Sequence, residues 1–129
     1  MRTLIPMIIL AACGTTTSQV KSGKAWKDAR PSDYPATHEQ VVASISNFCQ
    51  YRDFQMSWND DQSYLEAYRR ADKLGEQSVE LHVRIEAAPV AGMTRVTAIS
   101  GRSSGLVWKG RFMHERLQNH LRKDYPPQQ

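Results

Sequence analysis

The sequence lacks the features that define several well-known classes of protein. It has only two cysteines among 129 residues, Cys13 and Cys49, so it cannot carry the disulfide framework of a small secreted scaffold. No apolar stretch approaches the roughly 20 residues that a membrane-spanning helix needs. Basic residues exceed acidic ones only modestly, 17 against 13, which gives no support for a nucleic-acid partner. The length fits one small domain.

What the sequence does have is a distinctive amino-terminal segment. Arg2 is followed by an apolar stretch over residues 4–10, and two alanines then precede Cys13. A basic start, a short apolar core and small residues before a cleavage site are typical of a secretory signal peptide. We therefore predict that residues 1–12 form a signal peptide.

The run Leu10-Ala11-Ala12-Cys13 resembles the lipobox of bacterial lipoproteins. The resemblance implies cleavage just before Cys13, lipid on its sulfur, and fatty acid such as palmitate on the new amino terminus. Two or more acyl chains anchor a protein stably at a bilayer. An aspartate after the cysteine would signal retention in the inner membrane, and Gly14 stands there instead. The expected location is the periplasmic side of the outer membrane, while the inner membrane and the cell surface stay open.

Cys49, the second cysteine, has two interpretations. With Cys13 acylated, no disulfide can form within the chain, so Cys49 is either a reactive thiol or a buried packing residue. Because Cys49 follows Phe48 on a predicted apolar helix face, packing is favoured.

Residues 13–36 are predicted to form the lipidated cysteine and a flexible tether. The stretch contains a Thr/Ser run, two prolines and little apolar periodicity. Lys21, Lys24, Lys27 and Arg30 recur every three residues. Such a segment either touches lipid phosphates or is a solvated tether, and the tether is favoured. Trp26 could meet the membrane interface or the domain. At the other end, residues 125–129 are predicted to be a disordered tail.

Residues 37–124 have the periodicity of one folded domain. Thr37 and Gln40 match a capping box at the start of a helix, which the apolar spacing extends to about Tyr51. Strands are predicted over residues 54–58, 64–71, 78–87 and 94–100, separated by turn residues. A second helix is predicted over residues 109–123.

The clearest strand runs over residues 78–87. Its apolar side chains, Val79, Leu81, Val83 and Ile85, alternate with the polar side chains Glu80, His82, Arg84 and Glu86. This alternation is typical of an antiparallel strand with one solvated face. We therefore expect an α+β fold, a four-stranded antiparallel meander with the amino- and carboxy-terminal helices packed on its apolar face. The order resembles small bacterial lipoproteins with an α-β-β-β-β-α domain, a likeness of pattern that brings no functional residues.

The sequence contains no recognisable catalytic, metal-binding or cofactor motif. The four histidines, His38, His82, His114 and His120, lack the spacing of a zinc site. Residues 101–105 match neither a phosphate loop nor the nucleophile turn of a hydrolase. We therefore predict no catalytic residue, no metal and no cofactor. The candidate binding surface is the polar face of the third strand, with Glu80, His82, Arg84 and Glu86.

These features together favour a non-enzymatic binding module held at the envelope membrane by its lipid. Its expected partners are the membrane, through the anchor, and an envelope protein, met by the polar sheet face or by a strand edge. Two alternatives stay open. One is an immunity or inhibitor lipoprotein that neutralises a toxin in the periplasm, and the other is a small periplasmic hydrolase.

Overall fold

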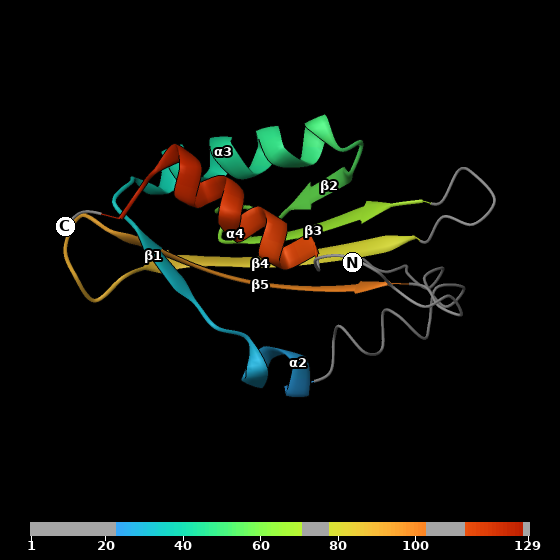
Figure 1. The fold of residues 1–129 in the computed structure, drawn as a ribbon, viewed down its shortest axis with the longest axis horizontal. Coiled ribbons are helices and arrows are strands. Elements are labelled where there is room, and N and C mark those ends of the chain that lie inside the picture. The colour runs from blue at the N-terminus through green and yellow to red at the C-terminus, as the bar shows by residue number, and fades with distance from the viewer. Residues whose placement is uncertain (1–22, 71–77, 103–112, 128–129) are drawn as a thin grey trace.

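The computed structural model describes residues 23–70, 78–102 and 113–127 (Figure 1). The elements in chain order are α2 (Gly23–Asp28), β1 (Ser32–Tyr34), α3 (His38–Tyr51), β2 (Gln55–Trp58), β3 (Tyr64–Arg69), β4 (Val79–Ala87), β5 (Thr94–Arg102) and α4 (Met113–Asp124). The predicted signal peptide, Cys13 and the first part of the predicted tether lie outside the described residues.

The predicted α+β class is confirmed, and the strands β2 to β5 form the expected antiparallel meander. The predicted number of strands, four, was wrong. Among the described residues the sheet has five strands in the order β1-β5-β4-β3-β2, because Ser32–Tyr34 pairs antiparallel with Thr94–Val96. This fifth strand falls in the stretch that the sequence assigned to the tether.

An ion pair fixes β1 on β5. Asp33 and Arg95 face each other across the two strands, and the guanidinium binds both carboxylate oxygens, at 2.8 and 3.1 Å. The hydrogen bonds from Arg95 are the main cause of a lowered Asp33 pKa. Because both side chains are partly exposed, the pair orients β1 more than it stabilises the domain.

The amino-terminal helix of the predicted domain, α3, begins where its capping box predicted. The Gln40 N–H donates to the Thr37 hydroxyl at 3.1 Å, and the Gln40 side-chain oxygen accepts from the Thr37 N–H at 2.9 Å. The helix ends at Tyr51, and Asp53 then takes a positive φ of 62° that turns the chain into β2. Both boundaries agree with the prediction.

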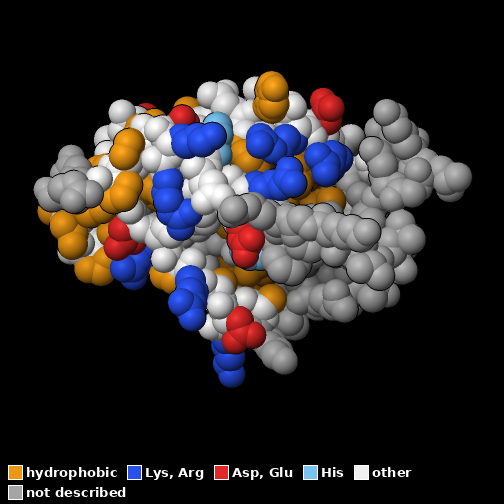
Figure 2. Space-filling view, viewed as in Figure 1, with side chains coloured by type: hydrophobic (Ala, Val, Ile, Leu, Met, Phe, Trp, Pro, Cys, Tyr) orange, Lys and Arg blue, Asp and Glu red, His pale blue; other side chains and the backbone are white. Residues whose placement is uncertain are grey.

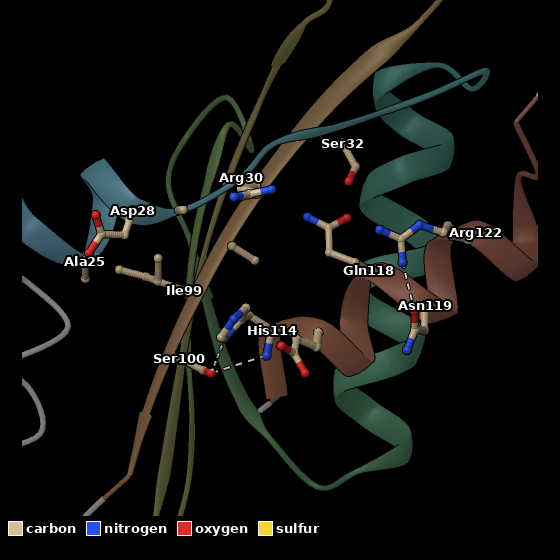
Figure 3. A pocket seen from close by; sticks show the side chains of 13 residues that line it. Ala25, Asp28, Arg30, Ser32, Ile99, Ser100, His114, Gln118, Asn119 and Arg122 are labelled. Carbon is tan, nitrogen blue, oxygen red and sulfur yellow. Dashed lines mark hydrogen bonds between the residues drawn. The ribbon is translucent and has the colours of Figure 1, made fainter. Parts of the chain in front are cut away.

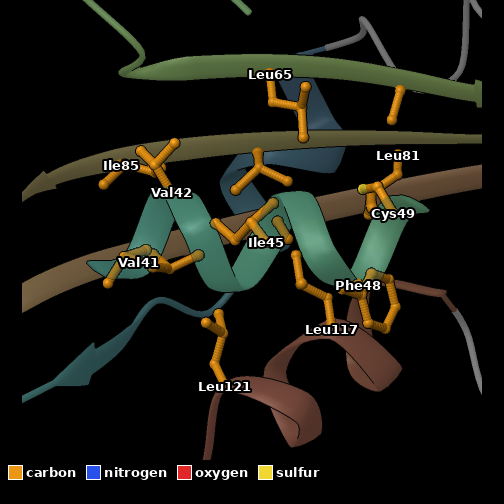
Figure 4. Packing of buried hydrophobic residues seen from close by; sticks show 14 of the residues in the cluster. Val41, Val42, Ile45, Phe48, Cys49, Leu65, Leu81, Ile85, Leu117 and Leu121 are labelled. Atoms are coloured by element: carbon orange, nitrogen blue, oxygen red, sulfur yellow. The ribbon is translucent and has the colours of Figure 1, made fainter. Parts of the chain in front are cut away.

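The hydrophobic core lies between the sheet and the two helices α3 and α4 (Figure 4). The two helices contribute Val41, Ile45, Phe48, Leu117 and Leu121, and the sheet contributes Leu65, Leu81, Val83 and Val96; each of these is 0 % exposed. Cys49 packs in the same cluster, and burial raises the pKa of its thiol to about 12. The structure thus supports the packing interpretation of Cys49.

The helix α2 lies on the opposite side of the sheet from α3 and α4 (Figure 1). Its Trp26 ring packs under the Arg84 guanidinium, 3.7 Å from the ring centroid, and lies 6.4 Å from the Tyr64 ring. The sequence left two environments open for Trp26, the membrane interface and the domain. In the structure Trp26 docks on the domain. This helix and β1 give the second half of the predicted tether a defined structure.

Candidate binding site at the edge of β5

The strand β5 is paired along its whole length on one side and along only part of its length on the other. β4 pairs with residues 94–102, whereas β1 pairs only with residues 94–96. Within the described part of the chain, no strand lies beside β5 beyond Val96.

The backbone groups of Ala98 and Ser100 point toward this open edge. In an antiparallel ladder, residues that bond to the neighbouring strand alternate with residues that bond away from it. The Ala88 N–H donates to the Met93 carbonyl at 3.1 Å. The backbone groups of Met93 and of every second residue after it, namely 95, 97, 99 and 101, therefore point toward β4. Ala98 and Ser100 belong to the other set. The backbone N–H and C=O groups of Ala98 and Ser100 form no hydrogen bond with the backbone of another described residue on the side away from β4.

A pocket of about 600 Å³ lies over the open edge (Figure 3). Its floor is Ala98, Ile99 and Ser100; one wall comes from α4 with His114, Gln118 and Arg122, and the other from α2 and the segment after it with Ala25, Ala29 and Arg30. Helices on opposite faces of the sheet thus form the two walls. A volume of about 300–1,000 Å³ is usual for ligand pockets.

Ser100 and His114 form a hydrogen-bonded pair at the bottom of the pocket. The Ser100 hydroxyl oxygen lies 2.7 Å from His114 Nδ1 and also accepts the backbone N–H of His114 at 3.3 Å. Burial lowers the pKa of His114, with Glu115 acting weakly in the opposite direction. The imidazole is therefore neutral at pH 7, and its tautomer decides whether Nδ1 accepts the Ser100 O–H or donates its own N–H to the hydroxyl oxygen.

Gln118 ties the α4 wall to the sheet. It is 7 % exposed, its amide nitrogen donates to the Val96 carbonyl at 3.1 Å, and its side-chain oxygen accepts the Tyr34 hydroxyl. A buried amide with both ends bonded positions a helix against a sheet at a fixed place. The pocket is therefore a fixed feature of the packing between α4, β1 and β5.

The charges of the pocket are mixed, with two arginines on the side nearest β1. Arg122 donates to the Asn119 side chain at 2.8 Å, a neutral partner, and Arg30 lies on the segment that leads into β1. Neither arginine forms an ion pair with another described residue. Asp28 and Glu115 also line the pocket, and Asp28 lies on the α2 side (Figure 3).

The predicted binding residues Glu80, His82, Arg84 and Glu86 do not form one exposed surface. Arg84 and Glu86 are exposed, but Glu80 is 7 % exposed and His82 is 3 % exposed, so the expectation of a fully solvated face was wrong for these two. Tyr64 lies over His82, with its hydroxyl 2.7 Å from His82 Nδ1. The guanidinium of Arg84 packs against the Trp26 ring.

Around His82 the outer face of the sheet holds a buried polar cluster. His82 Nε2 lies 3.3 Å from a Glu80 oxygen, and Nδ1 lies 3.7 Å from a Glu66 oxygen. Burial, followed by the charge of Glu66, raises the pKa of Tyr64 to about 12. These groups form hydrogen bonds and ion pairs with one another, so the cluster stabilises the outer face. Arg84 and Glu86 are the exposed members of the predicted set.

A second surface feature is a group of arginines beside α3. Burial and the positive charges of Arg116 and Arg69 lower the pKa of Arg52, whose guanidinium lies 4.0 Å from the centroid of the Phe48 ring. Figure 2 shows Lys and Arg side chains gathered on this side of the molecule. None of these three arginines forms an ion pair with a carboxylate of the described residues.

Neither the described residues nor a comparison with known proteins assigns a function to the chain. Residues 23–70, 78–102 and 113–127 contain no group of three or more potential metal ligands. None of the helices among them has the length and hydropathy needed to cross a bilayer. No family model, no curated protein and no solved structure matches the chain.

Sequence reasoning missed the residues that line the pocket. Ser100 and His114 are fourteen positions apart and meet only because α4 returns to the edge of β5. Gln118 belongs to no motif in the sequence that would mark it as a lining residue. The one sign of its role in the sequence is its place directly after Leu117, which lies on the buried face of the helix.

Proposed function

We propose that this chain is a membrane-anchored envelope lipoprotein whose domain is a non-enzymatic binding module. The observation that carries the binding role is the 600 Å³ pocket over the unpaired edge of β5. A strand edge with free backbone groups recognises other chains through main-chain hydrogen bonds. The lipobox ending at Cys13 supports the anchor, since acyl chains contribute about 0.8 kcal/mol per buried CH₂.

The anchor is tested by replacing its cysteine. Cys13→Ser should leave an uncleaved or soluble precursor that takes up no fatty-acid label, because the serine offers no thiol for lipid attachment. Membrane fractionation and metabolic labelling in cells measure this. Normal labelling and fractionation of the variant would disprove the anchor.

The binding role is tested in the same cells with a photoreactive residue in place of Asn119, which lines the pocket. The matched control carries it in place of Glu39, exposed on α3. A discrete adduct with one envelope protein is expected at position 119 and not at position 39. Equal adducts at both positions, or none at 119, would contradict a partner at the pocket.

The contact between Ser100 and His114 favours a hydrolase as the second candidate. A serine beside a neutral imidazole is the arrangement that activates a nucleophile. Here, however, the same hydroxyl accepts the backbone N–H of His114, so the bond also holds the first turn of α4. A fluorophosphonate probe decides between the two. Labelling of the full chain that is lost in Ser100→Ala would establish the hydrolase, and no labelling is expected.

A further inference from the structure

We propose that the pocket binds an extended peptide segment of an envelope partner, which adds to the sheet beside β5 in line with β1 and places an acidic side chain near Arg122 and Arg30. This inference rests on the binding role proposed above and names the chemistry of the partner. It follows from the backbone, the walls and the charges of the pocket.

The backbone of β5 offers the hydrogen bonds that an added strand needs. Ala98 and Ser100 are two residues apart and direct their N–H and C=O groups into the pocket, so they lie about 6.6 Å apart along the strand. An extended peptide repeats its own backbone groups at the same interval. Two residues of such a peptide would therefore pair with Ala98 and Ser100.

The position of β1 shows that a strand fits at this edge. β1 already pairs antiparallel with the neighbouring stretch, residues 94–96 of β5. The segment before it, with Arg30, turns away from β5 and forms one side of the pocket (Figure 3). A peptide in the pocket would continue the same edge where the chain's own strand stops.

The two walls define what the side chains of the peptide meet. Successive side chains of an extended peptide point to opposite faces of the sheet. On the α2 side they meet Ala25 and Ala29, whose small side chains leave room for an apolar residue, and Ile99, which is 5 % exposed. On the α4 side they meet polar groups of His114, Gln118 and Arg122.

The charges select an acidic residue at the end of the pocket nearest β1. Arg122 and Arg30 have no carboxylate partner among the described residues, and an arginine binds a carboxylate with two parallel hydrogen bonds. A glutamate or aspartate of the peptide would complete this pairing. A lysine that points to the α4 side would instead meet the like charge of Arg122.

Synthetic peptides test the proposal with the lipidated full chain in detergent. Three pools of capped hexapeptides carry Glu, Gln or Lys at one fixed position and Val, Thr, Ala or Ser elsewhere. By fluorescence polarisation, the Glu pool should bind at least about tenfold more tightly than the Lys pool. Arg122→Gln should abolish most of this preference, whereas Lys123→Gln, an exposed neighbour outside the pocket, should leave it unchanged.

N-methylated peptides test strand addition itself. Methylation of alternate residues removes either the N–H groups that face β5 or those that face away. One of the two complementary sets should abolish binding and the other should preserve it. In hydrogen exchange of the complex, the amides of Ala98 and Ser100 should slow about tenfold or more, whereas those of Thr97 and Ile99 already bond to β4 and should not change.

The outcomes separate this proposal from the proposed function. Binding in which both methylated sets are tolerated, or in which Ala98 and Ser100 gain no protection, would overturn strand addition. A dimer seen by light scattering that the peptides dissociate would show a second copy in the pocket and would also overturn it. A photo-adduct at position 119 with no binding of any peptide pool would leave the binding module standing and reject the peptide.

Discussion

His114 is a titratable side chain whose protonation opposes folding. Burial lowers its pKa in the folded protein, and the ordinary value is 6.5. The unfolded chain therefore binds more protons than the folded one over the interval between the lowered pKa and 6.5. In this interval the free energy of unfolding rises with pH.

The prediction is that the domain loses stability as the pH falls from 7 through 6.5 toward the lowered pKa of His114. Urea unfolding at a series of pH values measures the free energy of unfolding. His114→Asn removes the titrating group, so its stability should change less than that of the wild type over the same range. An identical pH dependence in the two proteins would show that His114 does not contribute.

Cys49 should behave as a small apolar residue without reactivity. It is 0 % exposed, and its pKa of about 12 keeps the thiol protonated. Native protein should therefore react with a thiol reagent only as fast as it unfolds. Cys49→Ala should lower the free energy of unfolding by about 1 kcal/mol and leave the molecular mass in solution unchanged. A disulfide-linked dimer on a non-reducing gel would contradict this.

At the scale of elements, β4 is buried on both faces over its first half. Val79, Leu81 and Val83 enter the core, while Glu80 and His82 are covered on the outer face. An aspartate at position 82 would bring a third carboxylate between Glu80 and Glu66 at a buried site.

We therefore predict that His82→Asp costs about 3 kcal/mol or more, comparable with Leu81→Asp, because each leaves a buried charge without a partner. Glu86→Gln, on the same strand face but exposed, should change stability by less than about 0.5 kcal/mol. Thermal melting of the three variants measures this. A melting temperature of His82→Asp equal to that of the wild type would mean that the outer face is solvated after all.

The elements that could be predicted from the sequence are those with a local physical signal. The capping box at Thr37 marks α3, and strict alternation marks β4. Asn59 marks the turn between β2 and β3, where its side chain accepts the N–H groups of Ser63 and Tyr64 at 2.9 Å. Each signal acts within a few residues, so it can be seen without the fold.

The elements that could not be predicted depend on contacts between distant residues. β1 is three residues long, too short for any periodicity, and it exists because Asp33 meets Arg95 and Tyr34 meets Gln118. The helix α2 lies on the sheet through Trp26 and Arg84. The candidate pocket is bounded by these same two elements, so no local pattern in the sequence could indicate it.

At the scale of the whole molecule, repulsion within the group of arginines beside α3 lowers the stability of the folded domain. Arg116 and Arg69 lie close enough to Arg52 to disfavour its positive charge. Their repulsion is screened by salt, since the Debye length falls from about 10 Å at 0.1 M to about 3 Å at 1 M.

Arg116→Gln should therefore raise the melting temperature at low salt and reduce the further rise that the wild type shows when salt is added. Lys123→Gln, exposed near the end of the same helix, serves as the control and should follow the wild type. Differential scanning calorimetry at several salt concentrations measures the effect. If Arg116→Gln lowered the melting temperature at low salt, its contacts would outweigh the repulsion.

The docking of α2 gives the domain a weak point under mechanical load. A pull from the amino-terminal side reaches α2 before any other described element. The Trp26 ring packs on Arg84, a contact of about 0.5–2 kcal/mol, whereas β1 is joined to β5 by backbone pairing and by the buried Tyr34. Tension would thus peel α2 away while the sheet stays intact. Since α2 is one wall of the pocket, tension on the chain would open the pocket before the sheet unfolds.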